Sequence, residues 1–338
     1  MKAVYLESPF KIGIKDVPVP DRKPREALVK IKSVGICGSD IGAFRGTNKL
    51  VTYPRVIGHE LAGEIVEVGE NPRNLKPGDK VIVDPYLYCG KCYPCSIGRT
   101  NCCENLKVLG VHIDGGMAEY ITHPDHMLVK VPDTLPWDII PMAEPLTIAL
   151  HAIHRSRLTA GEHIVILGAG GIGLLIAQSA LAYGAVPIIV DLDEERLKLG
   201  HSLGISHSIQ LGKQELISQV AKITNGRMAE VVVEASGANS AIRSTLDLVS
   251  FAGRIALTGW PPKETELPTD IITRKEIDIR GSRTSAGEFE EAIELISSGK
   301  VDARALLSKV VTLEEVPGIV REKTEDAGKY IKVNAIVN

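Results

Sequence analysis

A glycine-rich hexapeptide constrains the fold of this chain more than any other feature. It reads Gly-Ala-Gly-Gly-Ile-Gly over residues 168–173 and follows the apolar run His163–Leu167. An apolar helical pattern continues from it to about Tyr183, and a second apolar run covers Val186–Val190. A glycine-rich turn that leaves a buried strand and opens a helix holds a pyrophosphate at the helix N-terminus. The alternative is the same turn without a ligand, and its position between two buried strands favours the ligand-binding form.

Each glycine of this turn has its own role in that interpretation. Gly168 permits the tight turn, Gly170 lets the backbone approach a pyrophosphate, and Gly173 allows the helix to pack closely on the strand. Gly171 and Ile172, which complete the hexapeptide, are expected cofactor contacts as well.

An acidic residue ends the second strand. Asp191 comes eighteen residues after Gly173, and a carboxylate there accepts hydrogen bonds from an adenosine ribose. The same charge repels the 2′-phosphate of NADP, and Asp193 and Glu194 add to that repulsion. Arg196 is expected to flank the adenine end. The sequence therefore favours NAD over NADP.

Strands and helices alternate after about residue 145. A helical stretch covers about 145–156, and further strand candidates lie at 231–233 and 254–257. This alternation predicts a doubly wound parallel sheet with helices on both faces.

The two ends of the chain have a different pattern. Short alternating runs at 27–32 and 63–69, with a strand candidate at 81–83, predict a small antiparallel barrel or sandwich. The tail contains a helix pattern at 289–296 and a strand candidate at 330–337, which periodicity alone assigns to neither part.

Five of the six cysteines crowd into fifteen residues. They are Cys89, Cys92, Cys95, Cys102 and Cys103, and the sixth is Cys37. Four thiolates at such spacing predict a closed tetrahedral zinc site of structural type, in which the fourth ligand is Cys102 or Cys103. A zinc ribbon that binds nucleic acid is the rival interpretation. The few basic residues nearby form no stripe, which argues against it.

A second metal site is predicted from scattered residues: Cys37, His59, Glu60 and Glu144. Taken singly, each has an ordinary structural interpretation. Their settings, Gly-Ile-Cys-Gly-Ser-Asp over 35–40 and Gly-His-Glu over 58–60, favour an open zinc site whose free position takes water or a substrate oxygen.

These motifs, with Glu-Pro-Leu at 144–146, resemble the zinc-dependent medium-chain dehydrogenase/reductase family over essentially the whole chain. The resemblance implies a GroES-like, β-rich catalytic domain at 1–148 and 287–338, with a structural-zinc lobe at about 86–106. It implies a Rossmann domain at 149–286. It also implies an NAD- and zinc-dependent oxidoreductase with one catalytic and one structural zinc per subunit.

Within the family the chain is similar to the sorbitol dehydrogenase branch. The branch pattern implies Cys37, His59 and Glu60 as catalytic zinc ligands and Glu144 as a residue that binds the zinc or its water. It selects Cys103 as the fourth ligand of the lobe. Ser39 is expected to take the first proton, although Gly42 stands where many relatives carry a relay histidine. Further expected cofactor contacts are Leu257, Thr258, Gly259 and Ser282.

The peptides at 53–60, 98–103, 109–112 and 281–283 resemble L-galactonate and L-gulonate 5-dehydrogenases. The expected reaction is thus oxidation of a secondary hydroxyl of a sugar acid, with Arg283 meeting the substrate carboxylate. A cofactor or subunit contact is an equal alternative for Arg283. Oxidation of a neutral polyol or of L-threonine stays open, and so does a non-catalytic role in binding NAD or zinc.

Charge and hydropathy limit the partners. The net charge is −3, which gives no electrostatic case for nucleic-acid binding. The apolar stretches are too short for a membrane span, and the N-terminus is unlike a signal peptide, so we expect a cytoplasmic protein. The resemblance implies a homo-oligomer, a tetramer or a dimer.

Overall fold

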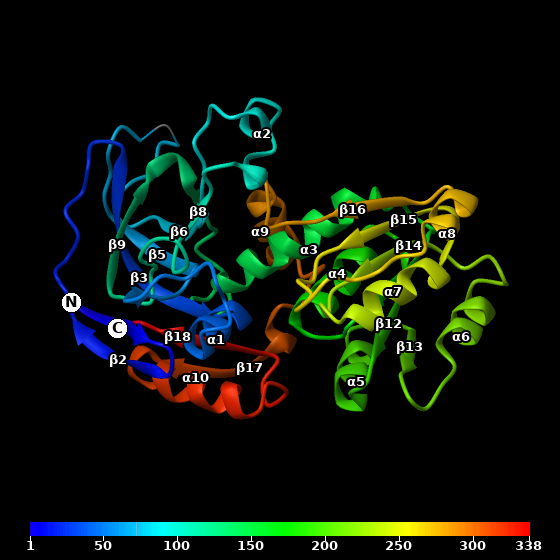
Figure 1. Ribbon diagram of the computed structural model, residues 1–338. Helices are drawn as coiled ribbons and strands as arrows, with labels where there is room; N and C mark the ends of the chain where they lie inside the picture. The colour runs from blue at the N-terminus through cyan, green and yellow to red at the C-terminus, as the bar shows by residue number, and fades with distance from the viewer. Residues whose placement is uncertain (72) are drawn as a thin grey trace. The chain divides into compact units, whose positions relative to one another are not determined.

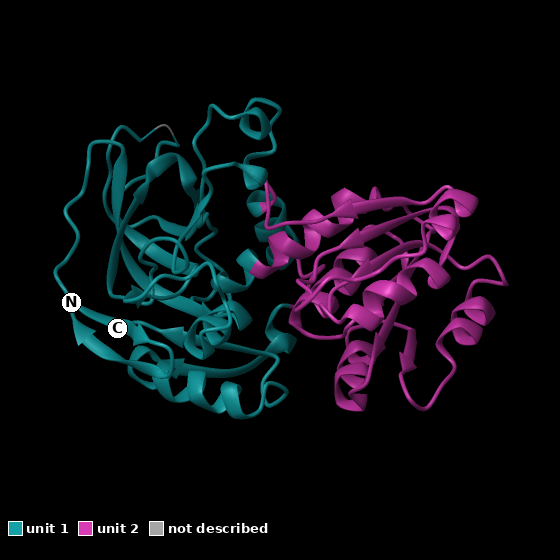
Figure 2. Ribbon diagram, viewed as in Figure 1, with its two compact units in different colours: residues 1–144, 289–297, 303–338 teal, residues 145–288, 298–302 magenta. Residues whose placement is uncertain are grey.

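Both ends of the chain belong to one of two units in the computed structural model, which describes residues 1–71 and 73–338. Unit 1 comprises 1–144, 289–297 and 303–338, and unit 2 comprises 145–288 and 298–302 (Figure 2). The boundaries expected from the sequence follow residues 148 and 286, whereas these units divide after residues 144 and 288. The short segment 298–302, which was expected in the catalytic domain, groups with unit 2.

Unit 1 is built on mainly antiparallel sheets, the largest of which includes one parallel pair, β17 with β18 (Figure 1). The largest has the order β10-β6-β5-β3-β18-β17, with β9 also paired to β3. Its strands are β3 (Glu26–Ile36), β5 (Glu60–Glu67), β6 (Lys80–Val83), β9 (Tyr120–Pro124), β10 (Leu128–Lys130), β17 (Leu307–Thr312) and β18 (Lys332–Ile336). A three-stranded sheet contains β1 (Lys2–Ser8), β2 (Lys11–Asp16) and β4 (Arg55–Val56), and a hairpin joins β7 (Tyr86–Leu87) to β8 (Lys107–Val108).

Alternation explains the central strand β3. Ala27, Val29 and Ile31 are fully buried, whereas the side chains between them are partly exposed. A period of two is what a strand with one face on the core requires. The tail strand β18 pairs antiparallel with β3, which assigns the C-terminal strand to unit 1. The helices of this unit are α1 (Gly38–Arg45), α2 (Tyr93–Ser96), α9 (Phe289–Ser297) and α10 (Val316–Glu325).

Unit 2 is a six-stranded parallel sheet of order β13-β12-β11-β14-β15-β16 (Figure 1). The strands are β11 (His163–Leu167), β12 (Val186–Asp191), β13 (His207–Gln210), β14 (Ala229–Glu234), β15 (Val249–Leu257) and β16 (Asp278–Gly281). The helices are α4 (Gly171–Ala182), α5 (Glu194–Ser202), α6 (Leu216–Ile223), α7 (Asn239–Leu248) and α8 (Thr269–Lys275). Helix α3 (Ala143–Ser156) has its first two residues in unit 1 and the rest in unit 2. The expected doubly wound Rossmann sheet and the expected β-rich domain are both confirmed.

Burial explains why this sheet is parallel. Ile164, Val165 and Ile166 of β11 are all fully buried, as expected for a strand covered on both faces. The order of strands reverses between β11 and β14. A crevice at the carboxyl ends of these two strands is where such sheets bind their ligands.

No helix in the described residues combines the length and the hydrophobicity that crossing a bilayer requires.

Candidate metal and dinucleotide sites

One thiol, one imidazole and one carboxylate meet in unit 1. The ligand atoms of Cys37, His59 and Glu60 lie within 4.8 Å of one another. Cys37 follows β3 and caps α1, whereas His59 and Glu60 stand at the start of β5. The pairing of β3 with β5 sets Gly35 opposite Glu60, and a Cβ at Gly35 would lie 1.8 Å from Glu60 Oε2. The close approach of the carboxylate therefore requires glycine at residue 35.

Asp40 and Ser39 surround the imidazole. Asp40 Oδ2 accepts a hydrogen bond from the Cys37 backbone N–H at 2.9 Å, and Asp40 Oδ1 lies 3.9 Å from His59 Nδ1. Ser39 Oγ lies 3.4 Å from His59 Nε2. The buried Nδ1 of His59 has no hydrogen-bond partner among the described residues. A thiolate, an imidazole with an unpartnered nitrogen and a carboxylate form a donor set that zinc accepts.

Lys332 is a residue of this site that sequence reasoning missed. Its buried ammonium forms an ion pair with Glu60 Oε2. The antiparallel pairing of β18 with β3 places Val333 opposite Ile36 and so brings Lys332 to the cluster. The signal in the sequence was a lone lysine inside a strand pattern that is otherwise mostly apolar.

Glu144 lies outside the set of three. It stands in the first turn of α3, is 3% exposed, and its Oε1 accepts a hydrogen bond from the hydroxyl of Tyr86. Its carboxylate interacts electrostatically with His59 and Glu60, and burial raises the pKa of Glu144 to about 7. The structure thus places Glu144 beside the cluster but with a phenol as its direct partner.

The second cluster contains four thiols: Cys89, Cys92, Cys95 and Cys103. Cys102, the alternative fourth ligand, is not among them. The Sγ atom of Cys92 lies 3.4 Å from that of Cys95 and 3.8 Å from that of Cys103.

Backbone N–H groups point at these sulfur atoms. The N–H groups of Cys89 and Asn105 both donate to Cys103 Sγ at 3.3 Å. Hydrogen bonds from the N–H groups of Lys91 and Cys92 lower the pKa of Cys89 to about 6. Gly90 has φ +70°, which suits the tight turn between the first two cysteines. Four sulfur atoms gathered in this way fit a closed tetrahedral metal site.

The glycine-rich turn of unit 2 is closely packed at Gly173 and open at Gly170. A Cβ at Gly173 would lie 1.8 Å from the carbonyl oxygen of Gly168, so the helix packs as closely on the turn as expected. At Gly170 a Cβ would meet no atom within 4 Å, which leaves space where a pyrophosphate approaches the backbone. Gly171 and Ile172 form the first turn of α4.

A pocket of about 320 Å³ adjoins this turn. Its lining includes Gly168, Asp191, Leu192, Ser236 and Ala241. The pocket combines Asp191, the expected ribose-binding residue, with a lining that is mostly apolar. This combination fits the adenosine half of a dinucleotide. Arg196 lies nearby, and its guanidinium faces Asp191 at 3.7 Å and Asp193 at 3.5 Å.

The other expected cofactor contacts follow β15 and β16. Leu257 ends β15, and the N–H groups of Thr258 and Gly259 donate to the carbonyl oxygen of Glu234 at 3.0 and 3.2 Å. The Ser282 N–H donates to the Leu257 carbonyl oxygen at 2.9 Å. The buried hydroxyls of Thr258 and Ser282 have no hydrogen-bond partner among the described residues, so a ligand can satisfy them.

Glu234, at the end of β14, was also missed from the sequence. It is fully buried, and its Oε1 accepts hydrogen bonds from the N–H and Oγ of Ser236 and from the N–H of Gly237. Its carboxylate therefore shapes the turn that lines the pocket. Arg283, the expected substrate contact, is partly exposed after β16 and belongs to unit 2.

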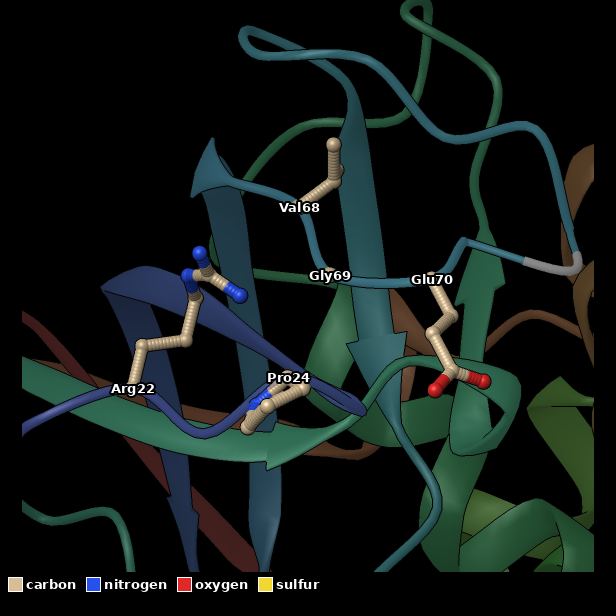
Figure 3. Close-up of a pocket in the computed structure, with 5 residues that line it drawn as sticks. All are labelled: Arg22, Pro24, Val68, Gly69 and Glu70. Carbon is tan, nitrogen blue, oxygen red and sulfur yellow. The ribbon is translucent and has the colours of Figure 1, made fainter.

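A further hollow in unit 1 does not involve these residues. It measures about 400 Å³ and lies between Arg22 and Pro24 on one side and Val68, Gly69 and Glu70 on the other (Figure 3). The guanidinium of Arg22 donates to the carbonyl oxygens of its own segment and to Glu67. We assign this hollow no role in the chemistry.

A metal cluster of one Cys, one His and one Glu leaves coordination positions for a ligand, and a Rossmann crevice accepts a dinucleotide. The fold and its sites thus define a metal- and dinucleotide-dependent oxidoreductase.

Comparison with known proteins identifies the family. Residues 23–133 match the model of the alcohol dehydrogenase GroES-like domain, and residues 171–298 match that of the zinc-binding dehydrogenases. An uncharacterized zinc-type alcohol dehydrogenase-like protein of Haemophilus influenzae is 56% identical, and the alignment covers 99% of this chain and 98% of that relative. Sorbitol dehydrogenase of Bacillus subtilis is 34% identical, with 100% of this chain and 98% of the relative covered. L-galactonate-5-dehydrogenase of Escherichia coli is 36% identical, with 91% of each covered.

Solved structures agree. A short chain alcohol dehydrogenase from Escherichia coli CFT073 complexed with NADH superposes with a TM-score of 0.93, at 34% identity and 99% coverage of both chains. A zinc-binding dehydrogenase from Sinorhizobium meliloti 1021 bound to NADP gives a TM-score of 0.93 at 30% identity, covering 99% of this chain and 98% of that one. The chain belongs to the zinc-type alcohol dehydrogenases of the medium-chain dehydrogenase/reductase family. Zinc and a nicotinamide dinucleotide are the cofactors of this enzyme, as the sequence predicted.

Proposed function

We propose that this enzyme reversibly oxidises a secondary hydroxyl of a sugar acid, such as L-gulonate or L-galactonate, to a ketone, with zinc and NAD. The observation that carries the oxidation is the cluster of Cys37, His59 and Glu60, whose donor atoms lie within 4.8 Å. The sugar-acid assignment is supported by the local peptides and by the similarity to L-galactonate-5-dehydrogenase.

In this proposal Cys37, His59 and Glu60 hold the catalytic zinc. Zinc bound there lowers the pKa of an alcohol and polarises a carbonyl. Asp40 fixes the Cys37 backbone and faces the imidazole of His59, so the cluster is oriented by its own helix α1. Ser39 Oγ accepts the hydroxyl proton of the substrate and passes it outward. Cys89, Cys92, Cys95 and Cys103 hold the second zinc, which keeps their lobe folded.

NAD is proposed to bind in the crevice of unit 2, and when bound it would supply the acceptor for the hydride of the substrate alcohol. Asp191 binds the adenosine ribose, and its charge, together with that of Asp193, disfavours a 2′-phosphate. Gly168–Gly173 bind the pyrophosphate at the N-terminus of α4. Leu257, Thr258, Gly259 and Ser282 line the crevice at the ends of β15 and β16.

Arg283 is proposed to bind the substrate carboxylate. A guanidinium forms two parallel hydrogen bonds with a carboxylate, which a neutral polyol cannot replace. The similarity to sorbitol dehydrogenase, and to the L-threonine 3-dehydrogenase of Bacillus licheniformis at 33% identity, keeps a polyol or L-threonine as the second candidate substrate.

A substrate panel tests the proposal. NAD⁺ reduction is followed by NADH absorbance with L-gulonate, L-galactonate and D-altronate, with the corresponding neutral polyols, and with L-threonine. We expect turnover with the hexonates. Turnover confined to polyols or to L-threonine would contradict the sugar-acid assignment while leaving the zinc and NAD chemistry standing. A cytoplasmic homo-oligomer, a tetramer or a dimer, remains our expectation for the protein in the cell.

A further inference from the structure

Tyr86 belongs by its backbone to the base of the four-cysteine lobe. It is the first residue of β7, pairs with Val108 of β8, and stands three residues before Cys89. Its N–H donates to Asp84 Oδ1 at 3.1 Å. The β7–β8 pair, whose strands lie immediately before and after the lobe in the sequence, therefore fixes the backbone position of Tyr86.

By its side chain Tyr86 belongs to the other cluster. The residue is 6% exposed, and its hydroxyl donates a hydrogen bond to Glu144 Oε1. Glu144 is itself buried and stands in the first turn of α3, outside the three residues whose ligand atoms converge. One phenol thus connects the lobe that holds four thiols with Glu144, a buried carboxylate that interacts electrostatically with His59 and Glu60 of the other cluster.

We propose that Tyr86 is a positioning residue of the oxidation site. Its hydroxyl holds Glu144 as a hydrogen-bond acceptor beside the cluster of Cys37, His59 and Glu60 and keeps it from serving as a direct metal ligand. The inference rests on the metal-dependent oxidation proposed above for that cluster. It also gives the lobe a second purpose, because an ordered lobe is what places Tyr86.

The physical argument is one of orientation. A glutamate has several rotamers, and a hydrogen bond to a rigid buried phenol selects one of them. Groups that orient a carboxylate or imidazole near a metal change affinity or activity by about 10- to 100-fold when they are removed. Loss of the Tyr86 hydroxyl alone, with the ring retained, is expected to produce an effect of that size.

The test compares Tyr86→Phe with Tyr88→Phe in the full-length, metal-loaded enzyme. Tyr88 lies two residues away on the same lobe and is 38% exposed, so its variant controls for general effects on the lobe. The first readout is the visible absorption of each protein with cobalt(II) at the Cys37 cluster, recorded without substrate. The second is kcat and KM with the alcohol that the wild type oxidises.

We expect Tyr86→Phe to change the cobalt absorption and to lower kcat about 10- to 100-fold with the KM for NAD⁺ unchanged, while Tyr88→Phe behaves as the wild type. In a Glu144→Gln background, removal of the Tyr86 hydroxyl is expected to change kcat by less than about twofold, because the two residues act as a unit. A wild-type spectrum and kcat in Tyr86→Phe would overturn the inference. So would an equal loss in Tyr88→Phe, or a full loss in the Glu144→Gln background.

Two features keep the outcome interpretable. If Tyr86→Phe is not recovered folded, 3-fluorotyrosine at position 86 keeps the ring and hydroxyl but alters the donor strength. A changed cobalt spectrum then supports the inference, and an unchanged spectrum overturns it. Because the spectrum is recorded without substrate, failure of the wild type to oxidise any sugar acid refutes the proposed substrate class and leaves this test intact.

Discussion

The backbone N–H of Ala169 donates to Asp191 Oδ2 at 2.7 Å, so the glycine-rich turn after β11 is tied to the last residue of β12. Asp191 Oδ1 accepts a second hydrogen bond, from the N–H of Asp193 at 2.9 Å. These two bonds fix the carboxylate in the lining of the pocket of about 320 Å³. A carboxylate fixed in this way loses little further conformational freedom when it accepts hydrogen bonds from a ligand.

Replacement of Asp191 tests this role. In Asp191→Ala we expect the KM for NAD⁺ to rise by about 10- to 100-fold, because hydrogen bonds to a charged acceptor contribute about 1.5–3 kcal/mol. The preference for NAD⁺ over NADP⁺ should fall as well, since a negative charge near the 2′ position is removed. The measurement is kcat/KM with each cofactor, and Asp270→Ala, at an exposed aspartate of α8 that does not line the pocket, serves as the control. An unchanged ratio between the cofactors would remove Asp191 from the ribose role.

Replacement of Cys37 tests the catalytic cluster. Cys37→Ser is expected to abolish turnover and to reduce the zinc content from two ions per chain to one, because the hydroxyl is a much weaker ligand than a thiolate. Affinity for NADH, measured by fluorescence titration, should stay within about twofold of the wild type, since the residues proposed to bind the dinucleotide do not include Cys37. Wild-type turnover in this variant would show that the zinc assignment is wrong.

The adjacent pair Cys102 and Cys103 gives a matched test of the lobe. Cys103 is buried and lies in the four-thiol cluster, whereas Cys102 does not. Cys103→Ser should therefore lose the second zinc and unfold at a clearly lower temperature, because loss of a structural metal removes folding free energy directly. Cys102→Ser should keep both zinc ions and the wild-type melting temperature. The reverse result would assign the fourth ligand to Cys102.

Glu288 predicts a pH dependence of stability. Burial alone would raise its pKa, but hydrogen bonds from His151 at 2.7 Å and His154 at 3.3 Å lower the pKa of Glu288 to about 2, from an ordinary 4.5. A lowered pKa means that the carboxylate stabilises the folded state above pH 4.5, and that this contribution is lost as the pH falls from about 4.5 towards 2.

The matched variants are Glu288→Gln and Glu294→Gln, an exposed glutamate on α9. At pH 7 we expect Glu288→Gln to unfold at a lower temperature than the wild type, with the difference shrinking as the pH is lowered below 4.5. Glu294→Gln should follow the wild type throughout. A difference that stays constant across this range would contradict the ionised Glu288 network.

Local patterns explain why much of this fold could be predicted. The strand at His163–Leu167, the glycine-rich turn and the strand from Val186 are neighbours in sequence, so their order along the chain determines the βαβ unit. The four thiols likewise lie within a single short loop. Boundaries were less accurate where a strand adjoins a helix. The strand expected at 254–257 begins at Val249, directly after α7. Val249 pairs with Ala229 of β14, and a register shift separates this pair from the regular pairing that starts at Arg254.

The residues that complete the site were not predictable, because distant segments bring them together. Lys332 reaches Glu60 through the pairing of β18 with β3, and Tyr86 reaches Glu144 across the fold of unit 1. Neither contact follows from spacing, since the register of a strand pair depends on the whole sheet. Glu234 was missed for a related reason. It resembles an ordinary strand end until its three hydrogen bonds to the next turn are seen.

The most direct test of the proposed function is the ratio of kcat/KM for L-gulonate to that for its neutral polyol, measured in the wild type and in Arg283→Gln. The exposed Arg274 of α8 provides the control variant, Arg274→Gln. We predict a wild-type ratio well above one that falls by about 10- to 100-fold in Arg283→Gln, because a charge-assisted bidentate pair contributes about 1.5–3 kcal/mol, and no change in the control. A wild-type ratio at or below one would contradict the assignment of a sugar acid as substrate.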